Sequence, residues 1–177
     1  MTPPLDNEFD AKAENISNLY ITAIERADDG ERTVCIDEMT GIQAIERKDK
    51  DLPLRPGKVK RREFEYIRHG TQALIANFDV VTGRVIDPTC GDSRNEQDFA
   101  QNVRKVIGSD PNAKKWDLIM DCLNTHQSES LVRLVLELEG LDIDLGVKGE
   151  SGILQSMKTR AAFLSDSTQR KSLSLHT

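Results

Sequence analysis

The pattern of apolar and polar positions along the 177-residue chain predicts strands first and helices later. Residues 32–36 and 116–121 are mostly apolar and show no alternation with polar residues, which is typical of central strands that are covered on both faces. Residues 71–79 are a further strand, and residues 84–87 follow a Gly-containing turn and are expected to return beside it as an antiparallel partner. Residues 141–145 could add a short strand.

Four segments repeat apolar residues at the three- and four-residue steps of a helix. They are residues 6–27, 94–107, 128–140 and 153–164. Ser93 and Glu96 have the spacing of a capping box, and Ser128 is a favourable N-cap for the third helix. Residues 170–177 show neither a cap nor an apolar stripe, so they are predicted to be a frayed end.

This order of elements predicts an α/β fold with a mixed sheet flanked by helices. The first three strands can form an antiparallel meander, and the fourth must then return beside the first through a helical crossover. That order is the one of a ribonuclease-H-like fold. We expect residues 1–30 to be an N-terminal linker helix and residues 31–177 to form the domain that carries the sheet.

Two aspartates follow the strands that the crossover makes neighbours. Asp37 ends the first strand and Asp121 ends the strand at 116–121. In open α/β sheets, ligands gather outside the carboxyl ends of the strands. An aspartate at a strand end is more often a turn residue than a ligand. A convergent pair, however, forms half of a divalent-metal site.

The charge of the chain is uneven. Its net charge is −6, which argues against a uniformly basic coat for nucleic acid. Residues 46–68 nevertheless contain nine Lys or Arg and five Asp or Glu, a local excess of four positive charges. Lys58, Lys60, Arg61 and Arg62 form its centre. Such a charge run is more often a solvated loop than a binding surface.

Composition also bears on the compartment. The three cysteines are far apart in the sequence and lack the spacing of a zinc site, so reduced thiols are expected. The N-terminus lacks the basic and apolar regions of a signal peptide. No apolar run approaches the ~18 residues needed to span a bilayer. These features predict a cytoplasmic protein without membrane contact.

Four motifs together resemble the DDE-type transposases of bacterial insertion sequences, in the mariner-like superfamily. They are CIDEMTG at 35–41, RPGK at 55–58, FEYIRHGT at 64–71 and DCLNTHQS at 121–128. The resemblance extends from about residue 8 to residue 170. It implies a ribonuclease-H-like catalytic domain that cleaves and joins DNA during transposition. It also implies that Asp37 and Asp121 are the first two catalytic carboxylates and hold Mg²⁺ or Mn²⁺.

The resemblance further implies DNA as the partner, both as transposon ends and as target, and allows a homodimer. We expect the basic cluster to track phosphates, together with two further residues. The full set of expected DNA contacts is Lys58, Lys60, Arg61, Arg62, Arg68 and His126. His126 could alternatively contact the metal site or orient its turn. Glu38 could assist at the metal but is more simply a local hydrogen-bonding residue.

The sequence departs from the family in three places. Cys122 stands where the family usually has Asn, the stretch that carries the third carboxylate is not present, and neither is the N-terminal helix-turn-helix region. Asp142 and Asp144 are the nearest substitutes for that carboxylate, although solvated loop positions fit them better. We therefore expect a weakly bound metal ion at most and an inactive catalytic-domain fragment.

Two other functions stay open. Asp37 and Thr40 have the spacing of an aspartate-nucleophile phosphotransferase, but Met39 stands where such enzymes usually have a second acidic residue. A non-catalytic DNA-binding or assembly protein derived from a transposase is the other alternative.

Overall fold

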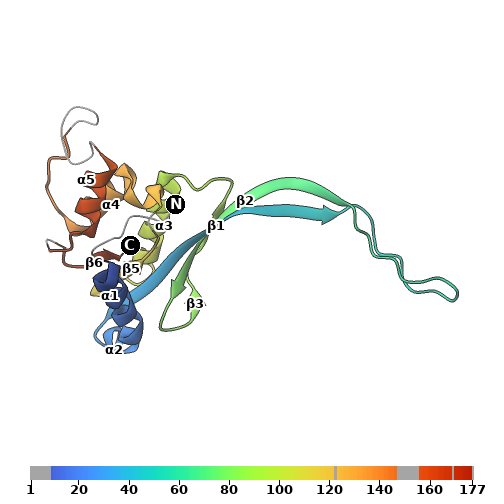
Figure 1. Cartoon of the computed structure of the whole chain (residues 1–177), viewed down its shortest axis with the longest axis horizontal. Coiled ribbons are helices and arrows are strands. Elements are labelled where there is room, and N and C mark those ends of the chain that lie inside the picture. Colours follow the sequence, from blue (N-terminus) through green and yellow to red (C-terminus); the bar gives the residue numbers. More distant parts are fainter. Residues whose placement is uncertain (1–8, 122, 147–155, 169, 177) are drawn as a thin grey trace.

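The computed structural model describes residues 9–121, 123–146, 156–168 and 170–176. They form a mixed sheet with helices on both faces, and a long two-stranded arm projects from it (Figure 1). The strand order is β3-β2-β1-β5-β6, and β4 pairs with β2. The strands are β1 Glu31–Arg47, β2 Tyr66–Asp79, β3 Arg84–Val85, β4 Thr89–Gly91, β5 Lys115–Ile119 and β6 Leu173–His176. The predicted α/β class with a mixed, helix-flanked sheet is confirmed.

The helices agree with the predicted segments, with shifted ends. They are α1 Phe9–Ile21, α2 Ala23–Asp28, α3 Glu96–Gly108, the 3₁₀ turn η1 Asn124–Gln127, α4 Glu129–Glu139 and α5 Met157–Ser165. The helix expected at 6–27 is two helices that meet at Thr22, whose hydroxyl donates to the Asn18 carbonyl and so competes with the helical backbone. Its first residues, 6–8, and residues 153–155 of the last predicted helix lie outside the described residues.

The sheet has the predicted connections. β1 and β2 pair antiparallel, β3 returns beside the end of β2, and β5 lies parallel to β1 after the α3 crossover. The short strand β4 was not predicted. It pairs with residues 73–75 of β2.

β1 is far longer than the predicted strand at 32–36. Beyond the body of the sheet it continues with β2 as a twisted two-stranded arm (Figure 1). Gly41, with a φ of 69°, lies at a register shift between Met39 and Ile42, where a bulge lets the ladder continue. Residues 48–65 form the far end of the arm, and isolated bridges at Leu52–Arg61 and Arg55–Lys58 hold the two chains together.

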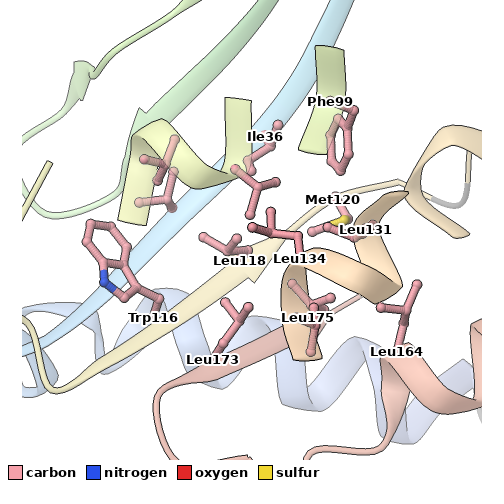
Figure 2. Close-up of a cluster of buried hydrophobic side chains, with 14 of the residues drawn as sticks. Ile36, Phe99, Trp116, Leu118, Met120, Leu131, Leu134, Leu164, Leu173 and Leu175 are labelled. Carbon is pink, nitrogen blue, oxygen red and sulfur yellow. The ribbon is translucent and has the colours of Figure 1, made fainter. Parts of the chain in front are cut away.

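The hydrophobic core lies between one face of the sheet and the later helices (Figure 2). Alternate residues of β1 and β5, such as Ile36 and Leu118, point to this face and pack against Phe99 of α3 and Leu131 of α4. α1 and α2 cover the other face, where Tyr20 reaches Cys35. α4 begins at the N-cap Ser128 and ends at Gly140, as predicted.

Two predictions for the C-terminal third are wrong. Residues 141–145 form no strand, because no neighbouring strand edge pairs with them. Residues 173–176 are not frayed but form β6, parallel to β5. Leu173 and Leu175 are buried in the core, so the alternation of Leu and Ser in this stretch is that of a strand.

Candidate metal centre

Asp37 and Asp121 occupy equivalent positions in the register of two adjacent parallel strands, Asp37 within β1 and Asp121 just after the end of β5. In the ladder between β1 and β5, Cys35 pairs with Ile119, and each aspartate follows two residues later. Neighbouring strands lie about 4.8 Å apart, so the register brings the two residues to one edge of the sheet. Asp37 is exposed, and the side chain of Asp121 is 54% exposed. The predicted adjacency of the two strands is confirmed.

Local hydrogen bonds hold each aspartate. One carboxylate oxygen of Asp37 accepts from the backbone N–H of Glu38 at 2.7 Å. Asp121 Oδ1 accepts from the backbone N–H of Leu123 at 3.2 Å and lies 3.0 Å from His126 Nδ1. Asp121 therefore ends its strand as a turn residue and still presents a half-exposed carboxylate to solvent.

Glu38 lies beside the aspartate pair but points the other way. Its side chain is only 1% exposed, because β1 alternates and Glu38 faces the side that α3 and α4 cover. One carboxylate oxygen lies 2.8 Å from Arg94 Nη1 and the other lies 3.3 Å from His126 Nε2. Glu38 was expected to assist at the metal or, more simply, to form local hydrogen bonds, and the contacts seen here are instead with residues far away in the sequence. Arg94 was not predicted.

His126 is buried, with 2% of its surface exposed. Nδ1 contacts the backbone carbonyl oxygen of Asp121 at 2.7 Å, and the ring packs on Phe99 with the centroids 4.1 Å apart. Both ring nitrogens already face partners within the protein, and the predicted contact of His126 with DNA stays a prediction. Its other predicted role, orienting the turn after Asp121, agrees with the contacts.

The donors at this edge suit a hard cation. Carboxylate oxygens are the ligands that Mg²⁺ and Mn²⁺ prefer, and Mg²⁺ is commonly held by one or two carboxylates with the remaining positions left to water and phosphate oxygens. Among the described residues, no group of three or more His, Cys, Asp or Glu side chains could hold a metal. Asp142 and Asp144 are exposed, and Asp144 accepts from the Gly146 N–H.

Apart from His126, the predicted DNA-binding residues lie on the arm. Lys58, Lys60, Arg61, Arg62 and Arg68 are all exposed. In the described part of the chain, the four residues of the basic cluster form no ion pair, so their charges are available to a ligand. Arg55, Lys58 and Arg61 also line a hollow of about 520 Å³ at the tip of the arm.

A second acidic residue of β5 has a structural role. Asp117 is buried on the α2 face, where it pairs with Arg26, with Lys115 at 3.4 Å and with His176 Nε2 at 2.9 Å. Burial alone would raise the pKa of Asp117, but the hydrogen bond from His176 and the charges of Lys115 and Arg26 lower it. This cluster fastens α2, β5 and β6 together.

The thiol of Cys35, two residues before Asp37, forms a hydrogen bond. Tyr20 Oη and Cys35 Sγ lie 2.8 Å apart. This hydrogen bond and partial burial raise the pKa of Tyr20 to about 12, and burial raises the pKa of the Cys35 thiol. Cys35 and Cys90 are free, and Cys122 lies outside the described residues.

Residues 32–144 match the family described as DDE superfamily endonuclease. Solved structures with a similar fold include the Mos1 mariner paired-end complex with Mn, at 19% identity, a TM-score of 0.43, and coverage of 76% of this chain and 41% of that chain. The Mos1 transposase paired-end complex with the left transposon end has 17% identity, a TM-score of 0.43, and coverage of 78% and 43%.

The chain thus spans about two fifths of the length of these solved proteins. No curated protein matches it. The family match covers more than half of the chain, from β1 through α4, and includes both aspartates. The chain therefore belongs to the DDE superfamily endonuclease family.

Proposed function

We propose that this chain is the catalytic-domain part of a transposase, and that Asp37 and Asp121 hold Mg²⁺ or Mn²⁺ against a phosphodiester of DNA. The observation that carries the proposal is the register of β1 and β5, which places both aspartates two residues beyond the paired residues Cys35 and Ile119. Family membership supports the same assignment.

A bound divalent ion would polarise the phosphodiester and stabilise the charge that develops as its bond is cleaved. The two aspartates would supply oxygen ligands from one open edge, where the exposure of Asp121 leaves room for a phosphate. The fixed β1–β5 ladder sets the spacing of these ligands before DNA arrives. Rigid strands hold such a site more accurately than loops do.

The arm would bind the DNA backbone away from this edge. Its exposed basic cluster can contact phosphates without reading bases, and such contacts give dissociation constants near 10⁻⁴–10⁻⁶ M at physiological salt. Transposon ends and target DNA are the proposed substrates. Pairing of two copies stays a prediction.

We also place the protein in the cytoplasm, where DNA is accessible and the free thiols of Cys35 and Cys90 would stay reduced. Among the described residues, no helix is both long and apolar enough to cross a membrane.

Coupling between metal and DNA tests the proposal. A metal ion that is shared by the aspartates and a phosphate must strengthen DNA binding, because each ligand then stabilises the other. Fluorescence anisotropy with a short duplex should show tighter binding in Mn²⁺ than in a metal-free buffer of equal ionic strength. This gain should disappear in Asp37→Asn and in Asp121→Asn.

Asp28→Asn is the matched control, since Asp28 is an exposed aspartate at the end of α2. It precedes the start of β1, whereas Asp37 lies further along that strand. This variant makes the same change in net charge and should keep the gain. A gain from Mn²⁺ that persists in both site variants would contradict the proposal.

One observation favours a second function, a DNA-binding or assembly protein that does not cleave. The described residues bring two carboxylates together but no larger metal-binding group, and the loss of a group that stabilises a transition state costs about 10²–10³ in rate. Nicking of supercoiled plasmid in Mn²⁺ decides between the two. Nicking equal to that of Asp37→Asn would favour the second function, and faster nicking would exclude it.

A further inference from the structure

The hydrogen bonds behind the metal centre assign a role to Glu38 that rests on the proposed function. We propose that Glu38 is a positioning residue, which holds Asp121 through His126 on one side and fixes Arg94 as a phosphate-binding residue on the other. The basis is a continuous set of contacts through a buried carboxylate that connects two exposed side chains at the same edge of the sheet.

The link to Asp121 is directional. The Asp121 backbone carbonyl oxygen can only accept a hydrogen bond, so His126 must donate to it from Nδ1 at 2.7 Å. The same nitrogen lies 3.0 Å from Asp121 Oδ1. This contact turns Nε2 towards Glu38, and the buried ring packs against Phe99 at an interplanar angle of 33°.

The same carboxylate also fixes the position of Arg94. Only one guanidinium nitrogen of Arg94 contacts Glu38, and the side chain is 41% exposed. Together with Leu123, Asn124 and Thr125, Arg94 lines a hollow of about 360 Å³ beside the turn that follows Asp121. The fork of a guanidinium can bind a carboxylate and still present N–H donors to a phosphate. Arg94 therefore lies where a DNA phosphate next to the metal centre could be bound.

Glu38→Asp tests the link without a change in charge, because the shorter side chain cannot span the 3.3 Å contact to His126. Groups that orient metal ligands typically affect affinity by 10–100-fold. Titration of Mn²⁺ followed by electron paramagnetic resonance should show binding about 10-fold weaker than in the wild type. Glu25→Asp, an exposed glutamate of α2, is the control and should bind Mn²⁺ unchanged.

Arg94→Gln should affect DNA binding and leave Mn²⁺ binding unchanged. It should bind Mn²⁺ no more weakly than the wild type but lose much of the gain in DNA affinity that Mn²⁺ produces. Loss of folding alone would lower both quantities together, so this separation distinguishes positioning from stability.

Thermal unfolding followed by circular dichroism shows whether Glu38→Asp is folded. If it is not, His126→Gln replaces it, since that variant removes the contact with the Asp121 carbonyl and should also bind Mn²⁺ about 10-fold more weakly. Wild-type Mn²⁺ affinity in the folded variant would overturn the inference and leave the proposed function intact. Absence of Mn²⁺ binding by the wild type would overturn both.

Discussion

Single residues at this site differ in how well the sequence predicts them. Asp37 and Asp121 are recognisable because each directly follows an apolar strand. Glu38 is not, because its role depends on which face of β1 is buried and on contacts with residues 94 and 126, far away in the sequence. The N-cap of α3 was also predicted only in part. Ser93 and Glu96 fit a capping box, but the structure forms it two residues later, between Asn95 and Asp98, and Ser93 donates to Asp98 instead.

The buried Asp117 gives a prediction at this scale. Asp117→Asn should lower the free energy of unfolding by about 3 kcal/mol near pH 7, because it removes the buried charge that pairs with Arg26, Lys115 and His176. This is the low end of the usual range, since Arg26 and Lys115 stay partly exposed and Arg26 keeps its second ion pair, with Glu31 at 2.7 Å. The measurement is urea unfolding, and Asp28→Asn, at an exposed position, should have little effect.

The loss should depend on pH. The pKa of Asp117 in the folded chain is lowered, so its ionised form stabilises the fold at pH values above the unfolded pKa of about 3.9. That contribution is lost as the pH falls through the lower folded pKa. The difference between wild type and variant should therefore shrink below about pH 4. A difference that stays constant down to pH 3 would exclude Asp117 as its source.

At the scale of elements, the central strands of the sheet and the edge strand β3 were predicted, whereas the other edge strand, β6, and the short β4 were not. β1 and β5 have long apolar runs, whereas β6 has only Leu173 and Leu175 within a polar stretch. Such a short alternation becomes a strand only because the free edge of β5 supplies a partner. The length of β1 was missed for a related reason. The part of β1 that lies in the arm is stabilised by its pairing with β2 and not by burial. A hydrophobic pattern does not reveal such pairing.

β6 gives the first prediction for an element. Leu173→Ala should lower the free energy of unfolding by about 2–5 kcal/mol, because it removes a fully buried side chain from the core (Figure 2). Leu54→Ala, at a position on the arm that is 74% exposed, should have almost no effect. Equal stability of Leu173→Ala and wild type in urea would mean that the C-terminal segment does not pack as a strand.

The arm gives the second prediction for an element. Replacement of the whole basic cluster by Gln should weaken DNA binding and reduce the slope of log K against log salt by about 0.9 for each lost phosphate contact. Binding is measured by anisotropy over a range of salt concentrations. The matched control replaces four exposed basic residues of the body by Gln, namely Arg84, Lys114, Lys158 and Lys171. An equal effect of both sets would mean that binding is not localised to the arm.

At the scale of the whole molecule, the sequence was sufficient for the fold class and for the connections of β1, β2, β3 and β5. These connections follow from the order of elements and the helical crossover. The two aspartates of the site could be identified from the sequence because each follows an apolar run, although Asp37 lies within β1 and not at its end. The contacts behind them, and the projection of the basic cluster on an arm, required the three-dimensional arrangement (Figure 1). The proposed function depends above all on the binding of a common metal ion by Asp37 and Asp121.

Cleavage of the polypeptide by bound iron tests this binding most directly. Fe²⁺ that replaces Mg²⁺ reacts with added hydrogen peroxide to give Fe³⁺, hydroxide and a hydroxyl radical, and ascorbate reduces Fe³⁺ back to Fe²⁺. The radicals cut the backbone close to the ion whether or not the protein has catalytic activity. The account predicts cuts near residues 37 and 121, competition by excess Mg²⁺, and loss of both cuts in Asp37→Asn and Asp121→Asn but not in Asp28→Asn. Cuts elsewhere, or cuts that survive either site variant, would contradict a metal centre shared by the two aspartates.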